Sequence, residues 1–401
     1  MTIVYDPRLP EVIADPYPTF HRLQAEDPVH WSEPLGGWVL TRYADVRAAL
    51  NEPRLSSDRI TPFKASASGQ RAGLGQLLRL VGLWAVFTDP PVHTRLRGLM
   101  NLAFTSRSVE RLRPRIEALI EELLDTTRGR GTMDVIADFA YPLPITVIAE
   151  MIGVPGRDRE DFKGWSDELA AFIGSAIATP DKYERAGRAI TAMAAYFRAM
   201  IAARRAKPHD DIMSGLVAAE ERGDVLSEDE LVATGILLLF AGHETTTNLI
   251  GNAVLALLRN ADQAELLRAH PELAAPAIEE LMRYDGPTQA MVRVAAEDID
   301  MHGKTIKRGD RIFTMINAAN RDPMQFTEPD RVDLRRQNNR HIAFGYGIHF
   351  CIGAPLARLE GQLAVPALLR RYPDLALASE PAWLPSLVFR GVKSLPVTFS
   401  L

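Results

Sequence analysis

Residues 344–353 read FGYGIHFCIG and contain the only cysteine of the 401-residue chain. Three glycines and three aromatic residues surround this thiol, and glycine backbone can approach a flat or bulky group closely. Residues 352–372 have the apolar spacing of a helix, so Cys351 should lie at a helix N-terminus, where free N–H groups favour a thiolate. The stretch therefore predicts a cysteine that binds a metal or a cofactor. A nucleophilic cysteine and a plain buried cysteine are the alternatives.

The second informative segment is SEDELVATGILLLFAGHETTTNLI, which begins at Ser227. Ser227 and Glu230 form the pattern of a capping box ahead of an apolar run, so a helix should begin there and continue to about Asn260. Its apolar middle contains Gly242, Glu244 and three threonines. Glycine and threonine are poor helix formers, and a buried carboxylate is costly unless it is paired or protonated. Such departures from the helical pattern indicate a site, with a structurally paired glutamate as the alternative.

The remaining pattern is mainly α-helical, with small β-sheets at the edges. Apolar residues at three-to-four spacing predict further helices over 160–177, 182–207 and 263–286. Strands are expected as a pair over 29–32 and 38–43, as short strands over 299–316, and as a closing hairpin over 387–401. No Ser/Gly, Pro-rich or charged linker divides the chain, so residues 1–401 are expected to form a single domain.

The composition limits the partners and the cellular compartment that we expect for this protein. The net charge of −5 argues against nucleic acid as a partner, because phosphate binding needs basic surface stripes. The first ten residues have neither the basic nor the apolar region of a signal peptide, and the apolar runs are shorter than a membrane span. A single cysteine cannot form an internal disulfide, which fits a reducing compartment. We therefore expect a cytoplasmic protein that binds neither nucleic acid nor a membrane.

Two residue pairs add weaker signals. Glu280 and Arg283 are three residues apart, and His93 and Arg97 are four apart, so each pair shares one face of a helix. Taken alone, each pair is typical of a solvent-exposed helix surface.

Together, these segments resemble the cytochrome P450 haem-thiolate monooxygenases of the soluble bacterial kind. AGHETT (241–246) is similar to the oxygen-activating segment of that family, and EELMR (279–283) to its Glu-x-x-Arg pair, with Arg331 as the third member of the triad. The residues of FGYGIHFCIG that fit the haem-binding pattern are Phe344, Gly347, His349, Cys351 and Gly353. The likeness covers essentially all 401 residues. It implies a single-domain cytochrome P450 fold, mainly α with small β-sheets, in which the long central helix crosses over the haem.

The resemblance implies haem b (iron protoporphyrin IX) as the cofactor, with Cys351 as the axial thiolate that pushes electron density onto iron. Glu280, Arg283 and Arg331 should form a buried ion network under the haem. Buried propionates need charge-assisted donors, and the expected ones are His93, Arg97, Arg293 and His349. The full set of residues expected to contact the haem is His93, Arg97, Ala241, Gly242, Arg293, Phe344, Gly345, His349, Cys351 and Gly353.

By the same resemblance, Glu244 and Thr245 form the proton-delivery pair, an acid that reaches toward solvent and a hydroxyl beside the oxygen site. Gly242 would leave room for oxygen where the helix passes over the haem. Thr246 remains the competing hydroxyl, because adjacent helix residues point about 100° apart and both cannot serve.

The resemblance also places a substrate pocket. Apolar lining fits a small lipophilic substrate, and residues 71–84 are expected to form a mobile lid. The sequence does not select among steroid, terpenoid, macrolide, fatty acid and aromatic substrates. The expected substrate contacts are Phe63, Leu77, Leu80, Val81, Trp84, Leu238, Ala241, Gln289, Met291, Val292, Val388 and Phe389.

The expected reaction is hydroxylation with O2 by a monomeric enzyme. Electrons would come from a separate ferredoxin or flavodoxin with its reductase, docking on the cysteine side, where Arg358 is a candidate contact. The alternatives are a peroxide-driven haem peroxygenase, a haem-binding sensor or carrier, and a cysteine hydrolase or transferase. The Glu244–Thr245 pair favours the monooxygenase, and Cys351 has no convincing His/Asp partners for hydrolysis.

Overall fold

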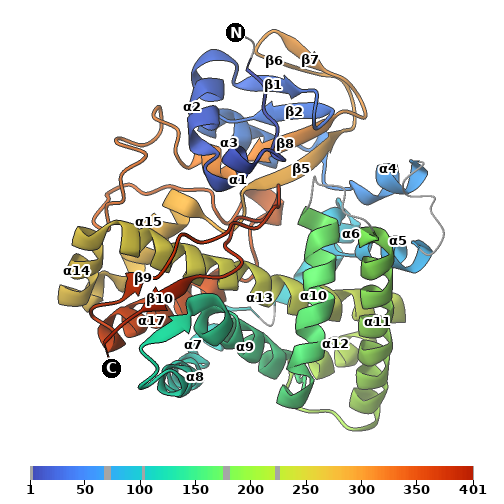
Figure 1. Ribbon diagram of the computed structural model, residues 1–401. Coiled ribbons are helices and arrows are strands. Elements are labelled where there is room, and N and C mark those ends of the chain that lie inside the picture. The colour runs from blue at the N-terminus through green and yellow to red at the C-terminus, as the bar shows by residue number, and fades with distance from the viewer. Residues whose placement is uncertain (1–2, 67–73, 102–103, 175–180, 222–225, 401) are drawn as a thin grey trace.

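A long buried helix organises the molecule. The computed structural model describes residues 3–66, 74–101, 104–174, 181–221 and 226–400. Helix α13 (Glu228–Arg259) crosses the middle of the protein (Figure 1), and its central turns are buried on most faces. The predicted capping box is confirmed: the Ser227 hydroxyl accepts from the Glu230 N–H, and the Glu230 carboxylate accepts from the Ser227 N–H at 2.8 Å.

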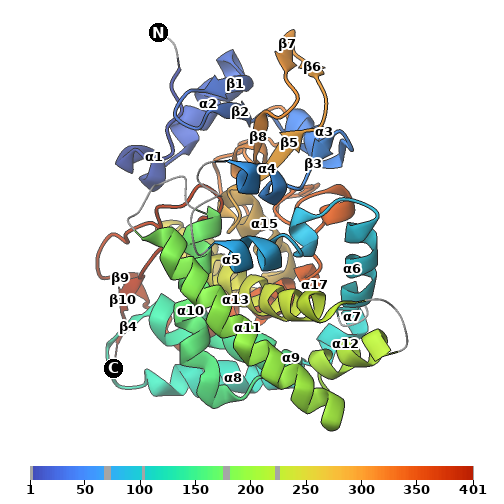
Figure 2. The same cartoon turned by 90° about the vertical axis from the view of Figure 1, so that its right-hand side faces the viewer.

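Other helices surround α13. The helices that pack directly against it include α9 (Pro142–Ile152), α11 (Lys182–Ala206), α15 (Ala274–Asp285) and α17 (Ala354–Arg371). Helix α10 (Arg159–Gly174) packs beside α11 on one flank of the molecule (Figures 1 and 2). The helical predictions over 160–177 and 182–207 are thus confirmed for the described residues, whereas 263–286 is broken at Pro271.

Shorter helices complete this layer. The α-helices are α1 (Pro10–Ala14), α2 (Tyr17–Glu26), α3 (Tyr43–Asn51), α4 (Ile60–Ala65), α5 (Gly75–Val81), α6 (Val92–Asn101), α7 (Ser106–Glu110), α8 (Arg113–Thr126), α12 (Ile212–Glu221), α14 (Ala261–Ala269) and α16 (Ile316–Ala319). The 3₁₀ turns are η1 (Ala85–Phe87), η3 (Gly156–Asp158), η4 (Pro271–Leu273) and η5 (Gly347–His349), and η2 (Val135–Ala140) is π-helical.

Small sheets lie at the edges of this helical body. The largest has the strand order β1-β2-β8-β5-β3 and lies beside α2 and α3 (Figure 1). Its strands are β1 (Val29–Ser32), β2 (Gly37–Leu40), β3 (Leu55–Ser56), β5 (Ala290–Ala295) and β8 (Arg311–Met315). Strands β1 and β2 pair, as predicted, and run antiparallel, whereas β2 and β8 are parallel. The hairpin of β6 (Ile299–Met301) and β7 (Lys304–Ile306) confirms the short strands within 299–316.

The C-terminal segment does not form the expected hairpin. Strand β10 (Pro396–Thr398) pairs with β4 (Thr132–Asp134) and with β9 (Ala376–Leu377), both antiparallel. Residues 387–392 make single bridges instead, Phe389 with Thr288 and Val392 with Trp383. The alternating residues correctly indicated extended backbone. They could not indicate that the strand pairs with β4, which lies far away in the sequence.

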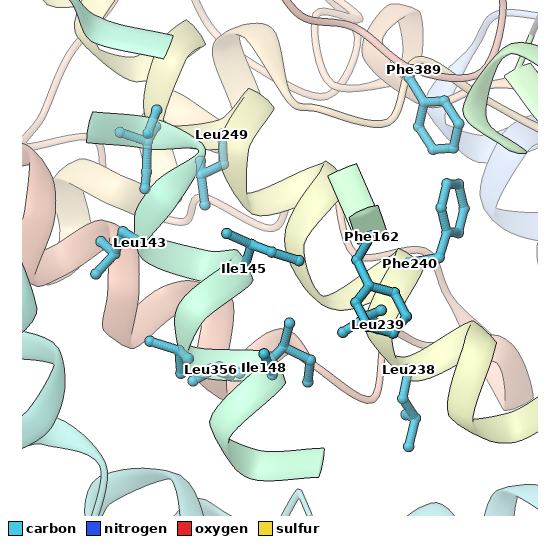
Figure 3. Packing of buried hydrophobic residues seen from close by; sticks show 14 of the residues in the cluster. Leu143, Ile145, Ile148, Phe162, Leu238, Leu239, Phe240, Leu249, Leu356 and Phe389 are labelled. Atoms are coloured by element: carbon cyan, nitrogen blue, oxygen red, sulfur yellow. The ribbon is translucent and has the colours of Figure 1, made fainter. Parts of the chain in front are cut away.

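The main hydrophobic core fixes the middle of α13. Figure 3 shows buried residues of this core, among them Ile148 of α9, Phe162 of α10, and Leu239 and Phe240 of α13. The AGHETT segment follows Phe240 directly, so this packing sets the position of the turn that carries Glu244 and the threonines.

One apolar stretch, Val135–Ile152, has the length and composition of a membrane-spanning helix. It covers η2 and α9, and 61% of it is buried inside the protein. Because α9 packs on α13, this burial is that of a core helix.

Candidate functional site

An apolar cavity lies between the middle of α13 and the loop that precedes α17. It encloses about 1160 Å³ of empty space, its open mouth included. The described residues that line it are Ala85, Val86, His93, Arg97, Met100, Phe104, Leu237, Leu238, Ala241, Gly242, Thr245, Thr246, Leu249, Met282, Pro287, Thr288, Met291, Ala343, Phe344, His349, Cys351, Ile352, Gly353, Leu356 and Ala357. The two segments that the sequence singled out, AGHETT and FGYGIHFCIG, therefore meet at one site.

The glycines of the cysteine loop let it turn beneath the cavity. Gly345 and Gly347 have φ angles of 76° and 73°, which side chains rarely allow. The Cys351 N–H donates to the Phe344 carbonyl at 2.9 Å, which closes the loop. A Cβ on Gly345 would lie 3.0 Å from the Met291 Cε, so the end of that side chain would have to shift slightly.

The Cys351 thiol faces backbone donors and cations. The N–H groups of Gly353 and Ala354 lie near it where α17 begins, as the sequence predicted, and the Ala354 N–H donates to the Cys351 carbonyl at 3.4 Å. Burial raises the pKa of the thiol, while these N–H groups and the charges of Arg97 and Arg358 act against the rise. The surroundings are those of a sulfur that carries negative charge once a positive centre binds it.

The four predicted propionate partners converge beside the cavity. His93 and Arg97 come from α6, Arg293 from β5 and His349 from η5, and the rings of His93 and His349 lie 4.2 Å apart. Burial and the neighbouring Arg293, His93 and Arg97 lower the pKa of His349 to about 3. Burial lowers the pKa of Arg293 to about 10, against the charge of Asp89. Positive charge is thus concentrated here in excess of negative charge.

This cluster contains donors that have no acceptor among the described residues. His93 Nε2 is buried and unpartnered, and the Arg293 side chain, 5% exposed, donates to the Val292 carbonyl alone. Burying a cation without a counter-charge is costly, and a ligand with carboxylates would supply the missing acceptors. The cluster therefore fits the propionates of a haem, and the Cys351 sulfur fits its axial ligand.

Two threonines of α13 line the cavity but have different neighbours. The Thr245 hydroxyl donates to the Ala241 carbonyl at 3.2 Å and stays at the cavity wall. The Thr246 hydroxyl faces Glu360 of α17, a fully buried acid. Burial raises the pKa of Glu360 well above its usual range, and the nearby Thr246 hydroxyl opposes this rise. Neither carboxyl oxygen of Glu360 has a hydrogen-bond partner among the described residues.

Glu244 points from α13 toward α10. Its carboxylate accepts from the Asn248 amide at 3.5 Å, a long contact. Burial and the charge of Asp167 raise the pKa of Glu244 to about 7, while Asn248 and Lys163 oppose the rise. The acid therefore exchanges its proton near neutral pH.

Gly242 lines the cavity, as expected, and its missing side chain also matters for helix packing. A Cβ at this position would lie 2.5 Å from Ile148 Cγ1 of α9. The glycine thus lets α9 approach α13 closely. The sequence alone could not distinguish this packing role from space reserved for oxygen.

The predicted ion network exists, but one member is wrong. Arg283 Nε and Nη2 each lie 2.8 Å from the Glu280 carboxylate, and both side chains are fully buried. The third cation is Arg336, with Nε 3.1 Å and 3.0 Å from the two Glu280 oxygens. The Arg331 side chain is 62% exposed and pairs with Glu328; only its carbonyl joins the network. The backbone turns at Glu328, where φ is 46°, and Arg336 reaches back instead.

Of the predicted substrate contacts, Leu238, Ala241 and Met291 line the cavity. Trp84 stacks on Phe240 at 5.6 Å, and Val292 packs in a separate core because strand alternation turns it away from the Met291 face. The predicted contacts that the structure places outside the cavity wall are Phe63, Leu77, Leu80, Val81, Trp84, Gln289, Val292, Val388 and Phe389.

The predicted lid falls partly on residues 71–73, which lie outside the described residues. The following residues form α5, whose Leu77, Leu80 and Val81 are fully buried in the main core. Sequence reasoning also missed about half of the cavity wall and the buried acid Glu360. The signal for Glu360 was a carboxylate on the apolar face of the helix after Cys351.

Comparison with known proteins gives the same assignment. Residues 66–379 match the family model described as Cytochrome P450. Cytochrome P450 107B1 of Saccharopolyspora erythraea is 45% identical over 384 residues, 93% of this chain and 92% of the relative. Cytochrome P450 monooxygenase PikC of Streptomyces venezuelae is 41% identical, over 96% of this chain and 91% of the relative. A crystal structure of P450BioI with an acyl carrier protein ligated to hexadec-9Z-enoic acid is 40% identical, with a TM-score of 0.91 over 98% of this chain and 99% of that one. The chain therefore belongs to the cytochrome P450 family of haem-thiolate monooxygenases.

Proposed function

We propose that the protein hydroxylates a lipophilic small molecule, with haem b as cofactor, O2 as oxidant and electrons from a separate redox protein. The observation that carries this proposal is the Cys351 thiol at the wall of an apolar cavity that also includes the Ala241–Thr246 turn of α13. We further propose that residues 1–401 act as one monomeric, cytoplasmic catalytic unit.

The chain offers a complete set of haem contacts. Cys351 would ligate the iron, and the amides at the start of α17 would hold the sulfur in place and stabilise its charge. When bound, haem b supplies the activation of O2 for insertion of one oxygen atom into the substrate. Phe344 lines the cavity next to the thiol, under the Arg358 guanidinium at 4.5 Å, and would restrict water access there.

Glu244 and Thr245 would move protons to the reaction site. A carboxyl with a pKa of about 7 both gives and takes a proton at neutral pH. The Thr245 hydroxyl lies at the cavity wall, whereas that of Thr246 faces Glu360. This difference supports Thr245 as the hydroxyl that hands the proton on.

The cavity wall supports a lipophilic substrate, since it is mostly apolar, with Leu237, Leu238 and Met291 among its members. Relatives of similar identity have names as different as Vitamin D(3) 25-hydroxylase and 6-deoxyerythronolide B hydroxylase. Membership of the family therefore does not select one substrate, and we propose the class alone.

A ferredoxin or flavodoxin with its reductase is the proposed electron source, docking over the cysteine loop. Ile348 and Phe350 of that loop are 54% and 40% exposed, which supports an apolar contact there. Arg358 pairs with Glu279 at 2.7 Å and covers the Phe344 ring, so we assign it to structure in place of partner steering.

The test is the spectrum of the reduced protein under carbon monoxide. The wild type should show the strongly red-shifted Soret band of thiolate-bound haem, and Cys351→Ser should lose it. A colourless wild-type protein, or a globin-like band position, contradicts the proposal. Turnover of a substrate found by its spin-state shift should require O2 and reduced ferredoxin or flavodoxin; turnover with hydrogen peroxide alone would point to a peroxygenase.

A further inference from the structure

A short segment between β3 and α4 braces the cationic cluster. The Ser57 hydroxyl lies 2.9 Å from His349 Nε2, and the Ser57 N–H donates to the Asp89 carboxylate at 2.9 Å. Ser56 donates its hydroxyl to the other Asp89 oxygen. Both oxygens of Asp89 thus have donors from this segment. Arg59 follows Asp58 at the end of this segment.

Arg59 has no charge partner among the described residues. Its guanidinium lies over the Phe87 ring at 4.4 Å, and no hydrogen bond or ion pair joins it to a described side chain. Phe87 belongs to η1, whose Ala85 and Val86 line the cavity. Burial and the charge of Arg293 lower the pKa of Arg59 to about 10, so the two guanidiniums lie within electrostatic reach of each other.

Among the described residues, Arg293 has only the negative charge of Asp89 near it and Arg59 has none, so these two neighbouring guanidiniums need a further anion between or beside them. Like charges repel, and burial increases the cost because solvent no longer screens them. Asp89 supplies one negative charge near Arg293, but its oxygens bond Ser56 and Ser57, and no ion pair joins it to either guanidinium. A carboxylate is the natural ligand for a guanidinium, which donates to both oxygens at once.

We propose that Arg59 is a further cofactor-binding residue, whose guanidinium donates to a haem propionate beside Arg293. The inference rests on the proposed function, since it requires haem. Arg59, His93, Arg97, Arg293 and His349 together exceed the donors that one carboxylate can use, and a haem brings two. Ser57 joins this site through His349, so residues 56–59 form one side of the propionate pocket.

The holoenzyme provides the test, with Arg59→Met as the main variant and Arg59→Lys as the conservative one. Methionine keeps apolar contact with Phe87 but removes the charge. Arg54→Met is the matched control, because Arg54 lies in the same region and pairs with Glu52 at the surface. The first readout is the rate at which haem transfers from the purified enzyme to excess apomyoglobin. The second is the midpoint potential of the ferric/ferrous couple in substrate-free protein.

Arg59→Met should transfer haem at least about ten-fold faster, the effect of losing one charge-assisted hydrogen bond. Its midpoint potential should fall, because a nearby positive charge stabilises the ferrous state. Arg59→Lys should keep the wild-type potential and lose haem at an intermediate rate, and Arg54→Met should match the wild type in both.

If Arg59→Met transfers haem at the wild-type rate and has the wild-type midpoint potential, the inference is wrong. The other source of a carboxylate is the substrate, which a second measurement separates. If Arg59→Met weakens the spin-state shift by myristate but not by 1-tetradecanol, with haem transfer unchanged, the anion is that of a substrate acid and the propionate assignment is wrong. Failure of the proposed function looks different, because the wild type itself would then lack the thiolate-haem spectrum.

Discussion

The buried network under Glu280 makes a sharp prediction about two arginines five residues apart. Arg336→Met should destabilise the protein strongly, and Arg331→Met should not. In the wild type, Glu280 accepts from Arg283, Arg336 and Asn339 side chains and from the Asp333 N–H, with no exposed surface of its own.

The expected size follows from what each substitution removes. Arg336→Met deletes both contacts with the Glu280 oxygens and three donations to the carbonyls of Thr327, Glu328 and Arg331. Because Arg283 still compensates the carboxylate, the loss should lie near the lower limit for breaking a buried ion network, about 3 kcal/mol. Arg331→Met removes one surface pair and should change the free energy of unfolding by less than about 0.5 kcal/mol.

Urea denaturation of both variants, followed by far-UV circular dichroism with the Soret band as a second probe, measures this difference. Arg336→Met should also purify with less haem, because the network joins α15 to the segment before the cysteine loop. Equal destabilisation by the two substitutions, or a loss below about 1 kcal/mol for Arg336→Met, would refute the reasoning.

Two further predictions concern the middle of α13. Thr245→Ala should keep the thiolate-haem spectrum but divert reducing equivalents to hydrogen peroxide, measured as peroxide formed per NADPH consumed; uncoupling by Thr246→Ala alone would move the role to Thr246. The pKa of Glu244 in the folded protein, about 7, exceeds its usual 4.5, so the wild type loses stability as pH rises through this interval. Glu244→Gln should therefore gain thermal stability relative to wild type at about pH 8 but not at about pH 4. A pH-independent difference in melting temperature would contradict the raised pKa.

The sequence predicted those helices whose start and periodicity depend on neighbouring residues alone. The capping box at Ser227 and the helix after Cys351 both form where side-chain chemistry and periodicity place them. The hairpin over 387–401 failed because alternation indicates a strand but not its partner, and β10 pairs with β4 from more than 250 residues earlier.

The prediction of the site was limited because the sequence does not show in which direction each side chain points. The resemblance indicated Leu238, Ala241 and Met291, which line the cavity, but it could not show that Trp84 stacks on Phe240 in the core. The exchange of Arg331 for Arg336 has the same cause. In an irregular turn no repeat indicates which side chain points inward, and the left-handed backbone at Glu328 decides it.

The hydrogen bond between Ser57 and His349 spans 292 positions of the chain. The parallel pairing of β2 with β8 likewise joins two segments that lie far apart in the chain. A nascent polypeptide emerging from the ribosome can build α2, β1 and β2 early, yet this pairing must wait until nearly the whole chain has been translated. The cavity wall therefore cannot close before Cys351 has been synthesised, and until then the early segments must stay soluble with one edge of their sheet unpaired.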